Sequence, residues 1–350
     1  INAPFFVQNA DFIAVHNYAF VHLYDILDRA KPGVKVLLNT PFNEEELARD
    51  LPANFKKRLA ENKAELYIID ASKIAMEAGL RNRINTIMQV CFFNITKVID
   101  EKTAINEIKQ AAIKAYSKKG QAIVDANIKG IDLATSKLVK VDVKKVVAAP
   151  SKPIVKAKVR DAYYNKFVKT IKDRLGDKMP VSAFNPDGSV PTNTTKFEKR
   201  GIALEVPVWQ SEKCVQCGQC SLVCPHAAIR TYLVPKKDMA KAPAGMKSRE
   251  AMGMKDYEYV IQSSCLDCTG CGVCAQVCPT KALEMKSLIA VKEQEVKNYE
   301  FAEKFDMPEN IPFPATTVKG VQFKQPYFEF SGACAGCGDT PYVKLVNQLF

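Results

Sequence analysis

The sequence has 350 residues, of which 47% are hydrophobic and 25% charged, and its formal net charge is +12. This length predicts two or three domains, each large enough to bury a core, and the composition is typical of a globular protein in water. No run reaches the roughly 18 consecutive apolar residues of a membrane-spanning helix, so we expect no membrane segment.

Residues 1–150 alternate short β-prone runs with helix-prone stretches. This alternation predicts an α/β domain with a mostly parallel sheet. Three acidic residues at 44–46 follow Pro41 and indicate a helix start, because acids are favourable in a first turn. The expected strands lie at 12–15, 34–38 and 66–70, and the expected helices include 43–48 and 104–109.

A change of composition at residue 146 predicts a linker over 146–159, followed by a short helix at 161–175. Residues 137–178 contain thirteen Lys and Arg and four Asp, which gives this stretch a net charge of +9. A solvated linker and helix face is favoured over a docking surface for an acidic carrier or another anion. Nucleic-acid binding is disfavoured because the basic residues are not interleaved with aromatic residues and no groove-reading motif is recognisable.

Eleven of the twelve Cys lie in the last 137 residues. Secreted disulfide frameworks are usually shorter and spread their Cys more evenly, so these clusters indicate metal binding in a reducing compartment. The run CVQCGQCSLVCP at 214–225 returns as CTGCGVCAQVCP at 268–279, and eight of sixteen aligned positions match. We therefore expect two halves related by approximate symmetry.

The spacing C-x2-C-x2-C-x3-C-P is typical of bacterial ferredoxins, in which the fourth Cys ligates the other cluster. We expect a small α+β ferredoxin-like domain with two [4Fe-4S] clusters over 206–325. The connection 225–267 is too long for a turn and is expected to contain a hairpin. Two such clusters would reduce the formal charge of +12 to about +8. The expected ligands are Cys214, Cys217, Cys220 and Cys278 for cluster 1, and Cys224, Cys268, Cys271 and Cys274 for cluster 2.

Zinc is the alternative metal, but its four-Cys sites usually combine two separate C-x2–4-C knuckles. Cys265 offers a second register with Cys268 and Cys271, which the repeat alignment and Pro279 disfavour, so it is interpreted as a spare thiol. Cys91 lies in an apolar helical pattern and is expected to be a buried small hydrophobe. Two histidines without metal-binding neighbours are expected to be structural, namely His16 and His22.

Three strings in this sequence resemble pyruvate:ferredoxin (flavodoxin) oxidoreductases. GLRNRINTIMQVCFF at 79–93 resembles their third domain, and TTKFEKRGIALEVPVWQSEKCVQCGQCSLVCPHAAIR at 194–230 resembles the junction into their ferredoxin-like domain. FSGACAGCGDTPYVKLVNQLF at 330–350 resembles the start of their thiamine-diphosphate domain. The resemblance implies a multidomain central fragment of that enzyme. Its parts would be 1–150, the third domain associated with coenzyme A; 151–205, the linker or EKR domain; 206–325, the ferredoxin-like domain; and 326–350, the truncated start of the thiamine domain.

In that family, pyruvate is decarboxylated on thiamine diphosphate with Mg2+, coenzyme A accepts the acetyl group, and electrons pass through [4Fe-4S] clusters to ferredoxin or flavodoxin. The resemblance implies that Cys334 and Cys337 supply two ligands of a third, proximal cluster; a redox-active pair is the alternative. Asp339 falls where the family has Glu near the thiamine cofactor. Asn85 and Asn127 are the implied coenzyme A contacts, with a helix or turn cap as the alternative.

No catalytic residue is expected within this stretch, so the fragment alone should be inactive. The alternatives are another 2-oxoacid oxidoreductase, including a version fused to a flavin reductase, and a stand-alone iron-sulfur electron-transfer module. The expected setting is a homodimer in the cytoplasm or a hydrogenosome-like organelle, with neither nucleic acid nor membrane as a partner.

Overall fold

The structure is a computed structural model that describes residues 7–81, 83–151, 161–305, 307–308 and 310–350. It divides into two compact units, Ile1–Lys158 and Val159–Phe350. Each unit has its own hydrophobic clusters of buried side chains. The first unit is a mixed α/β structure, and the second carries the cysteine repeats.

The first unit is built on a four-stranded sheet in the order β1-β2-β3-β4. β1 pairs with β2 and β2 with β3 in parallel, whereas β4 joins the edge antiparallel. The expected mostly parallel sheet is therefore confirmed, and the antiparallel edge strand is an addition. The strands are β1 (Ala10–Val15), β2 (Ala30–Asn39), β3 (Glu65–Ile69) and β4 (Val139–Val141).

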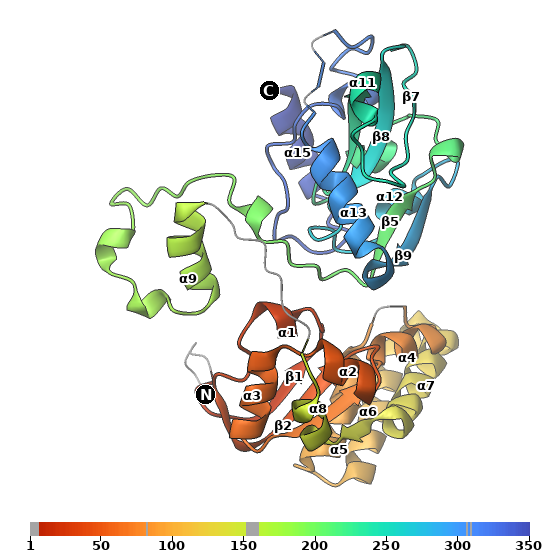
Figure 1. Ribbon diagram of the computed structural model, residues 1–350. Coiled ribbons are helices and arrows are strands. Elements are labelled where there is room, and N and C mark those ends of the chain that lie inside the picture. Colours follow the sequence, from red (N-terminus) through yellow and green to blue (C-terminus); the bar gives the residue numbers. More distant parts are fainter. Residues whose placement is uncertain (1–6, 82, 152–160, 306, 309) are drawn as a thin grey trace. The chain divides into compact units, whose positions relative to one another are not determined.

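Helices cover both faces of this sheet (Figure 1). In β2, Val36 and Leu38 pack with one set of helices, while Leu37 packs with the other. A strand buried on both sides explains why this segment is a nearly continuous hydrophobic run. One set is α1 (Phe20–Leu23), α2 (Glu44–Asp50), α3 (Ala53–Glu61) and α8 (Val143–Ala148); the other is α4 (Ala71–Glu77), α5 (Asn85–Thr96), α6 (Glu101–Tyr116) and α7 (Gln121–Lys137).

The start of α2 follows from a capping box. The Asn43 side chain accepts a hydrogen bond from the Glu46 backbone N–H, and the Glu46 carboxylate accepts one from the Asn43 N–H. These two bonds satisfy backbone donors that a helix start leaves without partners. The expected helix at this position is confirmed.

The expected linker begins later than residue 146, because 146–148 belong to α8. Asp142 caps that helix and Val146 is fully buried, so packing extends it into the Ala-rich stretch. Residues 152–160 of the linker lie outside the described residues. The helix expected at 161–175 is shorter and consists of a π-helical turn, Tyr164–Val168, continued by α9 (Lys169–Lys172).

The second unit contains a two-stranded and a three-stranded antiparallel sheet. β5 (Glu205–Trp209) pairs with β9 (Leu283–Ser287), and β6 (Ile229–Pro235) pairs with β8 (Tyr257–Ser263), which also pairs with β7 (Arg249–Glu250). The hairpin expected between the two cysteine runs is thus β6 and β8. The helices are α10 (Gln219–Leu222), α11 (Lys236–Met239), α12 (Val273–Gln276), α13 (Leu288–Ala302), α14 (Val318–Val321) and α15 (Thr340–Leu349). Short 3-10 turns lie at Gly176–Lys178, Val181–Ala183, Thr195–Phe197 and Ser211–Lys213 in this unit, and at Ser117–Lys119 in the first unit.

The sequence repeat is also a repeat of backbone structure. Gly218 and Gly272, which occupy matching positions, both have φ of +75° and open the short helices α10 and α12. Gln216 and Gly270 likewise match in the left-handed region, with φ of +54° and +70°. The strands follow the same shift, since β5 corresponds to part of β8 and β6 to β9. Two related halves therefore exchange strands to form their sheets.

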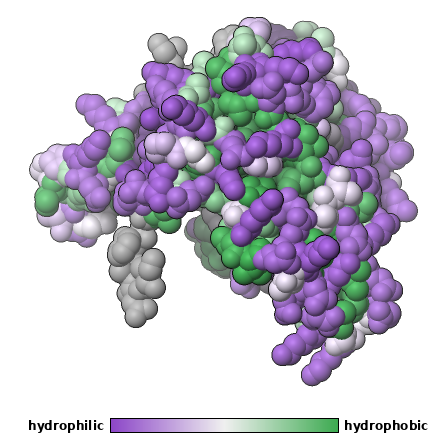
Figure 2. Space-filling view, turned by 90° about the horizontal axis from the view of Figure 1, so that it is seen from below, coloured by the Kyte–Doolittle hydropathy of each residue, from purple (hydrophilic) through white to green (hydrophobic). Residues whose placement is uncertain are grey.

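In the described part of the chain, no helix is both long and apolar enough to cross a membrane. Hydrophilic side chains cover most of the face shown in Figure 2, and hydrophobic ones gather in separate patches.

Candidate metal centres

The four Cys assigned to cluster 1 line one pocket. Cys214, Cys217 and Cys220 from the first repeat meet Cys278 from the end of the second, around about 320 Å³ of space. Apolar side chains complete the wall, among them Trp209, Ile261 and Leu283 from β5, β8 and β9. This pocket is hereafter the first-repeat pocket.

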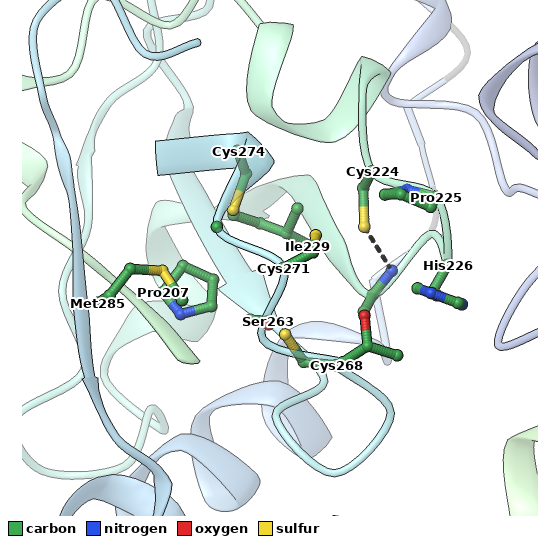
Figure 3. A pocket seen from close by; sticks show the side chains of 13 residues that line it. Pro207, Cys224, Pro225, His226, Ile229, Ser263, Cys268, Cys271, Cys274 and Met285 are labelled. Atoms are coloured by element: carbon green, nitrogen blue, oxygen red, sulfur yellow. Dashed lines mark hydrogen bonds between the residues drawn. The ribbon is translucent and has the colours of Figure 1, made fainter. Parts of the chain in front are cut away.

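The four Cys assigned to cluster 2 line the other pocket, hereafter the second-repeat pocket. Cys268, Cys271 and Cys274 meet Cys224 around about 360 Å³ of space. Figure 3 shows their sulfur atoms turned toward the space between them, with Met285 and Pro207 on one side. The two sets share no residue, and each takes three Cys from one repeat and one from the other.

The short helices explain this exchange. Cys220 lies in α10 and lines the first-repeat pocket, whereas Cys224 follows the same helix and lines the second-repeat pocket. Cys274 and Cys278 repeat this relation around α12. One helical turn thus carries the chain from one pocket to the other, and contacts between α10 and α12 hold the two turns together.

Backbone N–H groups donate to the sulfur atoms in the same pattern in both repeats. The Gln216 N–H donates to Cys214 at 3.4 Å, and the Gly270 N–H donates to Cys268 at 3.4 Å. The Ala228 N–H lies 3.3 Å from the Cys224 sulfur, and the matching Ala282 N–H lies 3.1 Å from Cys278. Such donors stabilise thiolates and raise the reduction potential of an iron-sulfur cluster.

The pKa values of the thiols reflect the same grouping. Burial, together with the charges of Cys214, Cys217 and Cys278, raises the pKa of Cys220 to about 12. Burial also raises the pKa of Cys268 to about 12, with Cys224 contributing. Thiolates gathered without a cation would repel one another, so each pocket requires a positively charged partner.

The spacing within the described residues does not suit a single ion. No three His, Cys, Asp or Glu side chains in that part of the chain are placed to hold one metal ion. Four thiolates around one zinc would lie about 3.8 Å apart, given Zn–S bonds of about 2.3 Å. Each pocket instead presents four Cys, the number of thiolates that a [4Fe-4S] cluster requires.

Cys265 and Cys91 line neither pocket. Cys265 is 1% exposed and packs in a separate apolar cluster with Ala203, Val206 and Leu288. Cys91 is buried within α5, where burial raises its thiol pKa to about 12. Both environments suit a small apolar side chain better than a ligand.

The third pair lies on the loop before α15. Cys334 is exposed, and Cys337 is partly exposed with its pKa lowered by backbone hydrogen bonds from Thr340 and Asp339. A Cβ placed on Gly336, between them, would lie 3.7 Å from the Cβ of Cys271. The third pair is therefore next to the second-repeat pocket.

The residues implied as contacts of organic cofactors lie on different elements of the two units. Asp339 is exposed just before α15, and Asn85 is exposed in the first turn of α5. Asn127 is buried within α7, where its amide donates to the Ile123 carbonyl at 2.8 Å. Neither Asn caps a helix, so the alternative of a helix cap is wrong.

Some contacts of the two pockets were not expected from the sequence. His226 lines the second-repeat pocket, and its Nδ1–H donates to the Ser331 carbonyl at 3.1 Å, which ties the pocket to the third pair's loop. In the sequence, the one signal for His226 was its position directly after Cys224 and Pro225.

His22 of the first unit, which was interpreted as structural, lies 3.0 Å from the Asp50 carboxylate.

Three family models match the chain in order. Residues 1–137 match a pyruvate ferredoxin/flavodoxin oxidoreductase model, residues 150–203 match the EKR domain, a domain of unknown function, and residues 210–282 match a 4Fe-4S dicluster domain. The last of these spans all eight Cys of the two pockets.

Curated relatives match along the whole chain. It is 47% identical to a pyruvate:ferredoxin oxidoreductase of Moorella thermoacetica and 43% identical to a pyruvate-flavodoxin oxidoreductase of Klebsiella pneumoniae, covering 100% of this chain and 30% of each relative. A pyruvate dehydrogenase [NADP(+)] of Cryptosporidium parvum is 40% identical over 100% of this chain and 20% of its own length. The chain thus spans less than a third of these proteins. In the order of the matched models and along its whole length, this chain is similar to a segment of pyruvate:ferredoxin/flavodoxin oxidoreductases.

Proposed function

We propose that this chain is the electron-transfer segment of a pyruvate:ferredoxin (flavodoxin) oxidoreductase. The observation that carries the proposal is the division of eight Cys between two pockets, with the fourth Cys exchanged in each. Cys214, Cys217, Cys220 and Cys278 hold one [4Fe-4S] cluster, and Cys224, Cys268, Cys271 and Cys274 hold the other. When bound, these clusters accept and release single electrons.

The proposed reaction of the whole protein is the oxidation of pyruvate by coenzyme A. Pyruvate and coenzyme A give acetyl-CoA, CO2, one proton and two electrons: the bond between the carboxylate and the carbonyl carbon breaks, and a thioester bond forms. Two molecules of a one-electron carrier, ferredoxin or flavodoxin, take the electrons. Thiamine diphosphate with Mg2+ would stabilise the carbanion formed in that step.

The residues of this chain act by binding and by electrostatics. The thiolates hold each cluster, and the backbone N–H groups of residues such as Gln216 and Ala228 hydrogen-bond to their sulfur atoms. Cys334 and Cys337 contribute two thiolates to a third, proximal cluster, and the approach of Gly336 to Cys271 supports a position beside the second-repeat pocket.

The remaining assignments belong to the same proposal. Residues 1–150 form the domain associated with coenzyme A, with Asn85 and Asn127 as contacts, and 151–205 form the EKR domain. Residues 206–325 form the ferredoxin-like domain, and 326–350 begin the thiamine domain with Asp339 near its cofactor. The whole protein is a homodimer of the cytoplasm.

An oxygen-free preparation tests the proposal. The 350-residue chain should contain about eight iron and eight sulfide, four of each per cluster, without stoichiometric zinc. After reduction, electron paramagnetic resonance should show two magnetically coupled clusters. Stoichiometric zinc, or reduced protein without that coupled signal, would refute the cluster assignment. Assays of the protein in its full natural length with ferredoxin, flavodoxin and NADP+ decide the acceptor.

A further inference from the structure

Helix α15 presents an unusual set of side chains to the cysteine-rich unit. Thr340, Lys344 and Gln348, which are spaced four residues apart on one helix face, are all buried. By contrast, Tyr342 is 73% exposed and Val346 is 56% exposed. The polar stripe of this helix, rather than its apolar stripe, therefore packs against the unit, and each buried polar group needs a physical reason.

Two of these groups have neutral partners. The Gln348 amide donates to the Lys324 carbonyl at 2.9 Å and to the Val321 carbonyl at 3.3 Å. Lys344, which is 2% exposed, directs its ammonium to the end of α10, where it donates to the Ser221 carbonyl and, at 3.0 Å, to the Leu222 carbonyl. Carbonyls at a helix C-terminus attract a cation, but a four-residue helix has only a small dipole.

Among the described residues, no Asp or Glu oxygen lies within 4.0 Å of the Lys344 nitrogen. Burial of an ammonium is costly unless an opposite charge compensates it. Burial lowers the pKa of Lys344 to about 8, while the thiolates of Cys224 and Cys220 oppose this change.

The two carbonyls that bind Lys344 lie between ligands of different clusters. Ser221 and Leu222 follow Cys220, which lines the first-repeat pocket, and precede Cys224, which lines the second-repeat pocket. A [4Fe-4S] cluster with four thiolates has a net charge of about −2 when oxidised and about −3 when reduced. A fixed cation at this position attracts both clusters and attracts the reduced forms more strongly.

We propose that Lys344 is the buried counter-cation of the two iron-sulfur sites and that its charge makes both clusters easier to reduce. The charge acts on both clusters, because the carbonyls that bind Lys344 lie between Cys220 and Cys224. No proton moves in this step, and each cluster gains one electron from the reductant. The inference rests on the proposed function, since it requires clusters at these Cys.

The test compares two neutral variants of the full natural-length protein, purified without oxygen. Lys344→Met removes both the charge and the hydrogen-bond donor, whereas Lys344→Gln keeps a donor for the carbonyls of Ser221 and Leu222. Lys237→Met, which removes an exposed Lys of the same unit, is the control for net charge. Iron is counted first, and reduction potentials are then measured by redox titration with electron paramagnetic resonance.

We expect both neutral variants to retain iron and to make reduction of the Cys224 cluster at least tenfold less favourable, about 59 mV for one electron. The Cys220 cluster should shift in the same direction, and the control should leave both potentials unchanged. Unchanged potentials in iron-loaded Lys344→Met and Lys344→Gln, or a shift in Lys344→Met alone, would overturn the inference.

Loss of iron also gives a decisive result. If neither neutral variant retains iron, Lys344→Arg decides, because it keeps the charge: retained iron supports the counter-cation, and lost iron overturns it. Absence of iron from the unmodified protein would instead refute the proposed function, so the two failures are distinguishable.

Discussion

At the scale of single residues, positions 216 and 270 differ in what surrounds them. Both have left-handed backbones, yet the first repeat carries Gln and the second Gly. A Cβ on Gly270 would lie 2.9 Å from the Glu205 carbonyl oxygen of β5, a contact shorter than real Cβ atoms make. The glycine is therefore required by the neighbouring strand as well as by φ.

Gly270→Ala should destabilise the second unit by about 2–4 kcal/mol, because the left-handed strain adds to a backbone clash. Gly245→Ala is the matched control, since its φ is also left-handed, no atom lies within 4 Å of its Cβ position and it lines neither pocket. It should cost only about 1 kcal/mol. Denaturant unfolding of both variants measures the difference, and equal costs would contradict the role of Glu205.

Two Cys substitutions distinguish ligands from the spare thiol. Cys265→Ser should keep the iron content of the unmodified chain, because Cys265 lines neither pocket, although it packs beside Cys268. Cys217→Ser should lose iron and the coupled resonance signal, since it removes a thiolate from the first-repeat pocket. Iron loss in the Cys265 variant alone would show that the second repeat is ligated in the other register.

The grouping of eight Cys around two pockets was predictable from spacing, because a cluster imposes fixed separations along a short chain. Lys344 was not predictable. On a helix that also carries Tyr342 and Val346, a lysine normally marks the face exposed to solvent. Here tertiary packing buries the face with Lys344 and exposes the face with Tyr342 and Val346. Trp209 and Ile261 were missed as pocket-lining residues for a related reason, since nothing in the sequence specifies which strands enclose a cluster.

At the scale of elements, the segment before α1 is tied to the end of α2. The Tyr18 hydroxyl donates to the Asp50 carboxylate at 3.0 Å, and His22 of α1 lies at the same distance from that carboxylate. Burial raises the pKa of Tyr18 far above its usual value, and the charge and hydrogen bond of Asp50 raise it further.

This raised pKa fixes the sign of a pH effect. Above about pH 10 the unfolded chain loses the tyrosine proton while the folded chain keeps it, so the contribution to stability falls by up to about 1.4 kcal/mol per pH unit. Tyr18→Phe should cost about 1.5–3 kcal/mol at pH 8, the value of a hydrogen bond to a charged group. The gap should narrow by pH 11.

Urea unfolding at pH 8 and pH 11 tests this, with Tyr24→Phe as a control. Tyr24 lies just after α1 and is exposed. A gap between Tyr18→Phe and the unmodified chain that stays constant with pH would contradict the prediction.

The elements themselves were largely predictable where hydrophobic periodicity was strong. The three strands at 12–15, 34–38 and 66–70 are present, and so are the helices at 43–48 and 104–109. Helix α14, which begins at Val318 with the Thr317 side chain accepting from the Gly320 N–H, was not predicted. A four-residue helix has too little periodicity to be seen in a sequence.

At the scale of the whole molecule, the two units have separate hydrophobic clusters. Every Cys that lines a pocket lies in the second unit, and so does Trp209, the single tryptophan. Trp209 packs against Tyr259 with ring centroids 6.1 Å apart. Its fluorescence therefore reports the unfolding of the second unit alone.

Removal of iron by a chelator should lower the denaturant midpoint of the Trp209 transition, because a ligand bound only by the folded state stabilises that state. Hydrogen exchange of β2 amides reports the first unit and should not change. A single transition shared by both probes, or equal shifts in both, would contradict separate unfolding.

The exchange of Cys224 and Cys278 between the repeats has a consequence for durability. Unfolding of one repeat would remove three thiolates from one proposed cluster and one thiolate from the other. Oxygen damage to either cluster should therefore lead to loss of both clusters, and repair would have to reassemble both.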